Sequence, residues 1–594
     1  MSRRIEDYAL IGNRHTAALV ALDGSIDWLC VPRFDSPACF AAMLGGDENG
    51  RWLISPRAEM KSVRRQYRDD TLILETVFET VDGEAALIDF MPVKEETGQV
   101  DLIRLVQGRR GSVAMRSELA LRFDYGQIVP WVRQQGGCIK AIGGPDAVLL
   151  RTPVETHSND FKSTADFIVS KGQTIPFAFT RYNSYQPEPP VSDPLSLLAR
   201  DLNWWTRWAS QCTYQGPYRS AVIRSLITLK ALTYGPTGAI IAAPTTSLPE
   251  RLGGPLNWDY RCCWLRDATF TSCALLESGY REQAVAWREW LLRSVAGQGD
   301  KLQPVYGLAG ERRLQEFELP HLPGYEGSKP VRIGNAAYQQ LQLDVYGELL
   351  SSLYVADRYH IEIDREVWLK HCEFLSYLEE VWEEPDDGIW ETRNGPRHLT
   401  ESKVAAWVAF DRGIKLIQSL RLDGPLERWR IIRDRIHADV CAHGYDSKRR
   451  SFVKSYGSSE VDAALLLLPL RGFLPVDDPR IVGTVEAIQR DLMEDGLVKR
   501  SFHAADGGEE GAFLPCTFWL VDCLVAMGRT AEARKTFEHL LGLRNNVGLL
   551  SEEYDCCRRR QLGNYPQTLS HMGLINSALN LLPTQTPLKV GRAD

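Results

Sequence analysis

Three acid-bearing stretches of the chain have the residue types that acid–base chemistry requires. The stretch LLSEEYD (549–555) places three carboxylates beside a serine and a tyrosine, where neither helical nor strand periodicity is present. The stretch DDGIWETRNGPRHLTESK (386–403) puts Glu391 directly after Trp390, and NWDYRCCWLRDA (257–268) ends in an Arg-Asp pair preceded by two tryptophans. Two carboxylates that flank one bond can act as a general acid and a general base. The question is whether the fold brings these stretches together.

The tryptophan before Glu391 suggests what this glutamate does. A carboxyl group held against an indole ring loses solvation of its charged form, which raises its pKa and suits it to donate a proton near neutral pH. The residues alone slightly favour the alternative, in which Trp390 covers the scaffold and Glu391 points to water. Glu401 is explained more simply as a charge in the first turn of a helix capped by Thr400.

The other two stretches also allow two interpretations. Arg266 and Asp267 open a predicted helix, where the helix dipole favours an aspartate and the arginine could be its ion-pair partner. Yet three aromatic residues occur among the seven from Trp258 to Trp264, more than a solvated loop usually carries. An acidic run such as 549–555 is usually a solvated face, but this one begins with two leucines and contains a tyrosine.

The composition narrows the class of protein. A chain of 594 residues predicts two or more domains. The 16 tryptophans and 21 tyrosines supply side chains that stack on sugars, whereas the net charge of -8 argues against a nucleic-acid partner. The first twenty residues lack the apolar core of a signal peptide, and no apolar run reaches the roughly 18 residues of a membrane span. We therefore expect neither a nucleic acid nor a membrane as partner.

The cysteines predict a reducing compartment. Their number, 13, is odd, they form no C-x-x-C pair, and two pairs are adjacent in sequence. This pattern favours reduced thiols and a cytoplasmic location over a disulfide framework or a zinc site. We see no metal-ligand spacing and no glycine loop that would hold a phosphate, so we expect chemistry that needs no cofactor and no metal.

The chain changes its periodicity near residue 190. Residues 1–190 contain runs rich in β-branched and aromatic residues, with Asp82-Gly83 as a hairpin turn, and predict an antiparallel β-sandwich. The proline-rich stretch 186–194 marks a boundary, 191–216 is taken as a linker, and 217–594 has helical periodicity.

Twelve helices are expected in this second region. Long and short connections alternate between them, which predicts six helical hairpins closed into an (α/α)6 barrel with every long loop on one rim. An open solenoid would give a similar rhythm, but no repeated signature supports it. Glu391 lies in the fifth connection and Glu552 in the eleventh, so a closed ring places them opposite each other. The predicted helices are 217–235, 266–279, 281–296, 336–357, 365–384, 400–421, 424–442, 459–471, 479–493, 511–528, 530–543 and 566–582.

Four motifs together carry a family resemblance. NWDYRCCWLRDA, GIWETR followed by SKVAAWVAFDR, LLSEEYD and GNYPQTLSHMGLINSA resemble glycoside hydrolase family 15, which contains glucoamylases, glucodextranases and bacterial trehalases. The opening DYALIGNRHTAALVALDGSIDWLCVPRFDSP is similar to the N-terminal β domain of the bacterial trehalase-like branch. The resemblance covers nearly the whole chain, and the motifs occur in the expected order.

The resemblance implies inverting hydrolysis of a terminal α-glucosidic bond. It assigns Glu391 as the general acid and Glu552 as the general base, with Glu553 and Asp555 in supporting roles. In such a mechanism the two carboxyl groups lie roughly 6.5 to 9.5 Å apart, and one must be protonated while the other is ionised. Their environments should therefore differ, with Trp390 against the acid. Activity should follow a bell-shaped pH profile.

The resemblance also implies the substrate contacts. Arg266 and Asp267 would bind the hydroxyls of the terminal glucose, and Trp264 and Trp390 would provide stacking surfaces. Tyr554 is expected at the site as well, where it or Ser551 would hydrogen-bond the base. The glucoamylase branch often has an acid at the position of Thr392, directly after the catalytic glutamate. This departure leaves Glu391 in place but puts the choice of substrate in doubt.

We expect one main activity and consider several alternatives. The main expectation is a glucoamylase-like exo-hydrolase that releases β-glucose from small α-glucosides or oligosaccharides, and the alternative is hydrolysis of α,α-trehalose. The loops 297–335 and 494–510, which face the leaving group, decide between them. A sugar phosphorylase is a further alternative, although Glu552 would repel phosphate. A sugar-binding protein without catalysis is another, although having both Glu391 and Glu552 argues against it.

Overall fold

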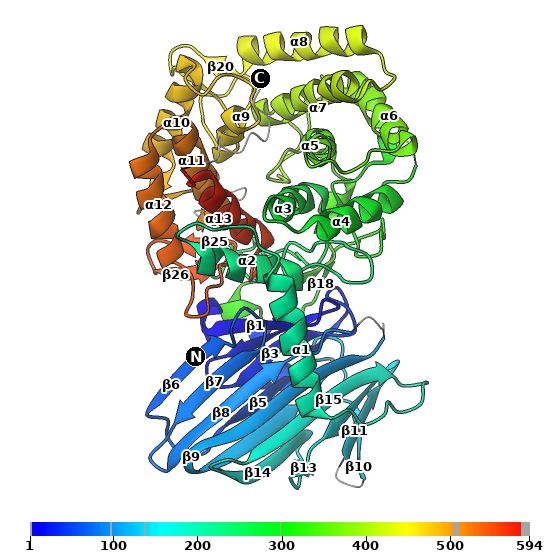
Figure 1. The fold of residues 1–594 in the computed structure, drawn as a ribbon, viewed down its shortest axis with the longest axis vertical. Helices are drawn as coiled ribbons and strands as arrows, with labels where there is room; N and C mark the ends of the chain where they lie inside the picture. Colours follow the sequence, from blue (N-terminus) through cyan, green and yellow to red (C-terminus); the bar gives the residue numbers. More distant parts are fainter. Residues whose placement is uncertain (1–2, 95–97, 136–137, 298, 503–509, 584–594) are drawn as a thin grey trace.

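The protein folds into a β domain and a helical domain (Figure 1). The computed structural model describes residues 3–94, 98–135, 138–297, 299–502 and 510–583. The β domain lies at one end of the molecule and the helices at the other, and helix α1 (Pro194–Ala209) runs between them. This order of domains is the one that the change of periodicity predicts.

Two antiparallel sheets of the β domain share the long strand β9 (Val100–Ala120). Its first half pairs with β8 (Gly83–Phe90) and β15 (Thr174–Asn183), and its second half pairs with β5 (Arg51–Pro56) and β14 (Lys162–Ser170). The predicted antiparallel β-sandwich is confirmed. The other strands are β1 (Tyr8–Gly12), β2 (Ala17–Ala21), β3 (Ser25–Cys30), β4 (Ala38–Phe40), β6 (Ser62–Tyr67), β7 (Leu74–Glu79), β10 (Trp131–Gln135), β11 (Cys138–Gly143), β12 (Asp146–Arg151) and β13 (His157–Asn159).

The interior of the sandwich combines aromatic packing with a buried ion pair. Trp52 of one sheet packs against Phe179 of the other, with ring centroids 6.0 Å apart. Arg104 donates a 2.7 Å hydrogen bond to Asp89, and both side chains are inaccessible to solvent. The guanidinium also donates to two backbone carbonyls, so this buried charge has the partners that its burial demands.

Helix α1 occupies much of the segment taken as a linker. Asp193 caps the helix by accepting a 2.9 Å hydrogen bond from the backbone N–H of Ser196, and Pro194 is the first helical residue. Proline is favoured at this position because its missing N–H would have no partner there. The proline-rich composition that indicates a boundary therefore also starts a helix. Trp208 at its end stacks on Tyr280 of the helical domain, with centroids 4.2 Å apart.

Among the described residues, twelve helices follow α1 along the chain, as the sequence predicts. They are α2 (Arg219–Ala231), α3 (Leu265–Glu277), α4 (Arg281–Ser294), α5 (Asp344–Arg358), α6 (Arg365–Val381), α7 (Thr400–Leu420), α8 (Leu426–His443), α9 (Leu467–Leu470), α10 (Pro479–Asp491), α11 (Leu514–Ala526), α12 (Thr530–Gly542) and α13 (Thr568–Asn580). Helix α3 contacts α5, α5 contacts α7, α11 contacts α13, and α13 contacts α3, while α4, α6, α8, α10 and α12 lie outside this ring. The predicted (α/α)6 barrel is confirmed.

Two predicted helices are shorter than expected. The prediction 336–357 includes a 3-10 turn, Ala336–Gln339, after which Gln340 is extended and α5 begins only at Asp344. The prediction 459–471 contains a 3-10 turn and the four residues of α9. In both cases the apolar spacing reflects burial against the barrel. Asn335 and Asp462 cap the two short turns, and the extended backbone of Gln340 separates the first turn from α5.

Side chains of the β domain support the loops of the barrel. Trp28 donates a 2.8 Å hydrogen bond to the carbonyl of Pro244, and Tyr125 OH accepts one of 2.8 Å from Arg261. The carbonyl of Tyr8 accepts from Tyr565 OH at 2.7 Å. These contacts hold the segments before α3 and before α13, which also carry the candidate site residues.

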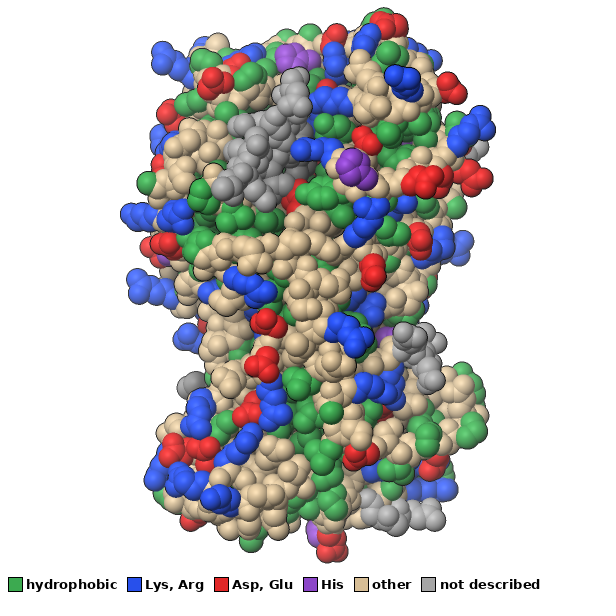
Figure 2. All heavy atoms as spheres, viewed as in Figure 1, with side chains coloured by type: hydrophobic (Ala, Val, Ile, Leu, Met, Phe, Trp, Pro, Cys, Tyr) green, Lys and Arg blue, Asp and Glu red, His purple; other side chains and the backbone are tan. Residues whose placement is uncertain are grey.

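The surface carries charges of both signs. Figure 2 shows lysine and arginine interspersed with aspartate and glutamate over the visible face. No helix of the described residues is long and apolar enough to cross a bilayer. All thirteen cysteines lie among the described residues, and each is a free thiol.

Candidate active site

A cavity of about 490 Å³, counting the space open at its mouth, lies at one rim of the barrel. Segments just before or at the beginning of the inner helices supply most of its wall. The lining residues are Ala242, Tyr260, Trp264, Arg266, Asp267, Ile389, Trp390, Glu391, Arg500, Phe513, Trp519, Gln567 and Leu569.

Glu391 lies in the loop between α6 and α7 and faces this cavity. Its backbone is left-handed, with φ of 54°, and its carbonyl accepts a 3.3 Å hydrogen bond from Gln340. Its carboxylate accepts hydrogen bonds from Trp264 Nε1 at 2.6 Å and from Arg266 at 3.4 Å. Burial raises the pKa of this carboxyl group, while Arg266 and the hydrogen bonds from its neighbours act in the opposite direction.

The indole that contacts this carboxylate is that of Trp264. Trp390, the residue directly before Glu391, lines the cavity, but its Nε1 donates to Asp462 at 3.2 Å. Its ring packs on Trp519, with centroids 6.0 Å apart. Consecutive residues in a tight loop point in different directions. The sequence predicts that Trp390 provides the apolar surroundings of Glu391. In the structure Trp264, from a distant segment, contacts the carboxylate, and Trp390 lines the same cavity.

Glu552 is fully buried directly before strand β25 (Glu553–Asp555). Its Oε1 accepts a 2.6 Å hydrogen bond from Tyr260 OH, and its Oε2 accepts one of 3.1 Å from the backbone N–H of Asn564. Burial raises the pKa of this carboxyl group, whereas the charge of Arg500 and these two hydrogen bonds lower it. Gly563 approaches the carboxylate so closely that a Cβ there would lie 2.5 Å from Oε2.

The neighbours of Glu552 in sequence turn elsewhere. Ser551 Oγ donates a 2.7 Å hydrogen bond to the carbonyl of Glu553. Tyr554 is half-buried on the opposite side of β25, near Glu6 and Cys556, and is not part of the cavity lining. The structure therefore gives Glu552 its partners from the 257–264 segment and from the turn before α13.

Arg266 and Asp267 begin helix α3 at the inner end of the cavity. Arg266 pairs with Asp344 at 3.2 Å and with Asp267 at 3.4 Å. Burial raises the pKa of Asp267 to about 7, helped by the negative charges of Glu391 and other nearby carboxylates and opposed by Arg266. The Oδ1 atom of Asp267 is buried and makes no hydrogen bond with good geometry. An acceptor in this state, beside a cavity, can receive a hydroxyl donor from a ligand.

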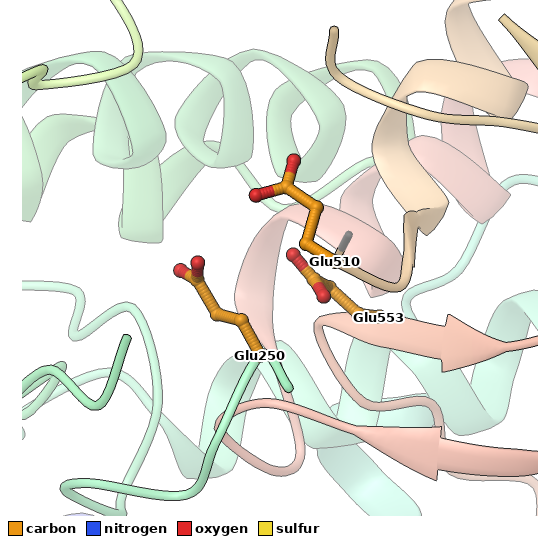
Figure 3. Close-up of side chains that lie close together, drawn as sticks. All are labelled: Glu250, Glu510 and Glu553. Carbon is orange, nitrogen blue, oxygen red and sulfur yellow. The ribbon is translucent and has the colours of Figure 1, made fainter. Parts of the chain in front are cut away.

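A second acidic group surrounds Arg500, which also lines the cavity. Figure 3 shows Glu250, Glu510 and Glu553 close together, and their carboxylate oxygens lie within 4.8 Å of one another. Arg500 pairs with Glu553, with Glu250 at 3.1 Å and with Glu510 at 3.2 Å. The cation that these three carboxylates hold is therefore a side chain of the protein itself. The same guanidinium favours the ionised form of Glu552.

One segment connects the surroundings of the two glutamates. Tyr260 donates to Glu552 and Trp264 donates to Glu391, and the two rings lie 5.5 Å apart. The aromatic content of this stretch indicates a ligand site but does not identify these hydrogen bonds. Arg500 lies in the loop 494–510, which the sequence singles out only as a loop that could face the leaving group. Glu391 therefore lies in the cavity lining together with polar groups able to bind hydroxyls, whereas Glu552 is outside the lining and is joined to it through the hydroxyl of Tyr260.

Comparisons with known proteins agree with this architecture. The model of glycosyl hydrolases family 15 matches residues 216–579, and a model of the trehalase-like N-terminal domain matches residues 1–179. A trehalase of Thermoplasma volcanium is 35% identical over 97% of this chain and 93% of its own length. A trehalase of Thermoplasma acidophilum is 36% identical over 95% and 98%, and one of Mycobacterium tuberculosis is 35% identical over 97% and 89%.

A bacterial glucoamylase complexed with acarbose has the same fold. Its structure superposes with a TM-score of 0.73 over 98% of this chain and 94% of the glucoamylase, at 12% sequence identity. At this identity the likeness shows the arrangement of sandwich and barrel, and it says nothing of the substrate. The family model covers more than half of the chain, and the trehalases align over almost all of it. The chain belongs to glycoside hydrolase family 15 and is a glycosidase.

Proposed function

We propose that the chain hydrolyses α,α-trehalose with inversion at one anomeric carbon, with Glu391 as the general acid and Glu552 as the general base. The observation that carries this proposal is that two carboxylates each accept a hydrogen bond from the 257–264 segment: Glu391 lines the cavity, and Glu552 is fully buried next to the lining residue Tyr260. Inverting hydrolysis requires two such groups on opposite faces of a sugar ring.

The proposed reaction has two proton transfers and releases two glucose molecules of different configuration. Glu391 donates its proton to the bridging oxygen as the bond between this oxygen and the attacked anomeric carbon breaks. Glu552 accepts a proton from the water that attacks the same carbon from the other side. The attacked glucose leaves as the β anomer, and the other glucose keeps the bridging oxygen and leaves as the α anomer. Arg266 and Asp267 bind hydroxyls of the attacked ring.

Burial raises the pKa of both carboxyl groups, opposed in Glu391 by Arg266 and hydrogen bonds from its neighbours, and in Glu552 by Arg500 and the hydrogen bonds from Tyr260 and Asn564. A raised pKa suits Glu391 to hold the proton that an acid donates. The division of the two roles between Glu391 and Glu552 rests on the motifs to which they belong.

The choice of trehalose rests on the relatives. The proteins that align over nearly the whole chain at 35 to 36% identity are named trehalases. They favour the alternative substrate of the sequence analysis over its main expectation, a glucoamylase-like hydrolase of oligosaccharides. The match of residues 1–179 to a trehalase-like domain points the same way.

Proton NMR of released glucose tests the proposal directly. The purified protein is incubated with trehalose, maltotriose and isomaltotriose, with and without phosphate. From trehalose we expect α- and β-glucose in equal amounts at the earliest times, before mutarotation, and no dependence on phosphate. Faster release of β-glucose from maltotriose would favour the oligosaccharide hydrolase, and glucose 1-phosphate as product would mean a phosphorylase.

Variants of the two glutamates test the assigned residues. Glu391→Gln and Glu552→Gln should each lower kcat by at least about 10³-fold, because each removes one arm of the acid–base pair. Glu384→Gln is a matched control, since Glu384 is an exposed glutamate of the same loop as Glu391. Full activity in either catalytic variant would contradict its assigned role.

A further inference from the structure

A group of four side chains at the barrel mouth lies outside the cavity lining. The ring of Trp258 has two arginine side chains stacked near it, with the guanidinium carbon of Arg393 at 4.0 Å and that of Arg332 at 4.5 Å from its centroid. Glu316 pairs with Arg393 through two contacts of 3.0 and 2.5 Å, and with Arg332 at 3.3 Å. We call Trp258, Glu316, Arg332 and Arg393 the Trp258 clamp.

The Trp258 clamp joins three separate segments of the rim. Trp258 belongs to the segment before α3, Glu316 and Arg332 to the long loop between α4 and α5, and Arg393 to the loop between α6 and α7. Arg332 also donates to the backbone carbonyls of Pro255 and Asn257, at 2.8 and 3.0 Å. Strand β16 (Cys263–Trp264) of the first segment pairs with β17 (Val305–Tyr306) of the second, and the clamp adds a side-chain link that also reaches the loop between α6 and α7.

Two members of the clamp are close in sequence to Glu391 and to a hydrogen-bond donor of Glu552. Arg393 follows Glu391 by two positions, and Trp258 precedes Tyr260, the hydrogen-bond donor to Glu552, by two. The carbonyl of Trp258 also accepts a 3.0 Å hydrogen bond from Asn564, whose backbone N–H donates to Glu552. The contact between Arg393 and Trp258 therefore connects the loop that carries Glu391 with the segment that holds Glu552.

The chemistry of the clamp suits a positioning role. A paired arginine–carboxylate contact fixes orientation as well as distance, and an arginine over an indole face adds a second constraint at right angles to it. Glu316 and Arg332 are largely shielded from solvent, with 16% and 12% of their side chains exposed, whereas Arg393 is 43% exposed. Glu391 itself has a left-handed backbone, a conformation that persists only where the surroundings hold it.

We propose that Arg393 and Trp258 are positioning residues that set the separation of Glu391 from Glu552 across the barrel mouth. This inference rests on the proposed function of the two glutamates. An inverting pair must leave room for one water molecule, so a shift of the loop carrying Glu391 harms the chemical step more than it harms sugar binding.

Four variants and one matched control test the inference. Arg393→Ala, Trp258→Ala, Trp258→Phe and Glu316→Gln are compared with the wild type on the sugar that the wild type hydrolyses. The control is Arg133→Ala, because Arg133 lies 3.9 Å from the centroid of Trp131 in the β domain and repeats the contact far from the barrel. The measurements are kcat, KM, inhibition by glucose and the melting temperature.

The expected result is a split between kcat and KM. Arg393→Ala and Trp258→Ala should lower kcat by about tenfold, since small displacements of a catalytic group are costly, with KM and glucose inhibition changed by less than about twofold. Trp258→Phe keeps a ring face for Arg393 and should recover most of the activity. Glu316→Gln keeps the shape and removes the charge, and should lie between wild type and Arg393→Ala. Arg133→Ala should match the wild type.

Other outcomes overturn the inference in distinguishable ways. Wild-type kcat in Arg393→Ala and Glu316→Gln would exclude a positioning role even if Trp258→Ala fails to fold. A raised KM with unchanged kcat would mean that these side chains contact the sugar instead. If the wild-type protein turns over none of the sugars tested, the proposed function fails and this inference falls with it. Loss of activity in the variants, with an active wild type, is a different result and concerns the positioning role alone.

Discussion

The indole N–H of Trp264 donates a 2.6 Å hydrogen bond to the carboxylate of Glu391, across 127 positions of the sequence. Four residues before Trp264, Tyr260 donates an equally short bond to Glu552. One segment therefore supplies a donor to each of the two carboxylates, which come from loops on different sides of the barrel. Because a donor to the charged form of a carboxyl group lowers its pKa, this segment tunes both groups.

The pH profile of the wild-type protein should be displaced upward. With Glu552 as the proposed base, activity is lost as the pH falls below the pKa of this group. With Glu391 as the proposed acid, activity is lost as the pH rises above the pKa of that group. Burial raises both values above their ordinary range. We expect a bell-shaped profile of kcat/KM with both limbs above the roughly 4.3 of an ordinary glutamate. An acidic limb below pH 4 would contradict this.

Removing each donor should move a different limb of that profile. Trp264→Phe deprives Glu391 of a donor to its charged form, which raises its pKa and shifts the basic limb upward. Tyr260→Phe does the same for Glu552 and shifts the acidic limb upward. The measurement is the pH dependence of kcat/KM for each variant beside the wild type. If both variants move the same limb, the assignment of acid and base is wrong.

Gly563 should tolerate no side chain. Its φ of 72° disfavours other residues, and a Cβ there would lie 2.5 Å from Oε2 of Glu552. Gly563→Ala should therefore displace the carboxylate and lower kcat by more than about tenfold. Gly457→Ala is the matched control, because Gly457 has a φ of 76° but open space around the position of a Cβ. Equal kcat values in the two variants would show that the contact with Glu552 has no effect of its own.

The buried ion pair of the β domain should contribute far more to stability than an exposed one. Asp89→Ala leaves the charge of Arg104 without its partner in the interior, and should cost about 3 to 5 kcal/mol of unfolding free energy. Arg116 and Asp166 form a similar two-contact pair on the surface, with both side chains 43% exposed. Asp166→Ala should cost at most about 1 kcal/mol. Urea denaturation followed by circular dichroism compares them, and equal midpoints would contradict the expectation.

The order of the domains and the closed barrel are predictable from sequence patterns alone. Strand periodicity up to residue 190 and the alternation of long and short helix connections follow from local burial, which a linear pattern records. The same patterns placed Glu391, Glu552 and the Arg266-Asp267 pair in loops at one rim. The helix α1 was not recognised, because the proline that starts it also marks a boundary.

The side chains that surround each carboxylate could not be predicted from the sequence and are known from the folded structure. The sequence pairs Glu391 with Trp390 and Glu552 with its neighbours, because adjacency is the only proximity that it displays. In the fold Trp390 lines the same cavity but donates its N–H to Asp462, and the contacts to the two carboxylates come from Trp264, Tyr260 and Arg500. Such contacts depend on how loops that are distant in sequence are placed relative to one another at the rim of the barrel. This placement results from tertiary packing, which a local sequence pattern does not show.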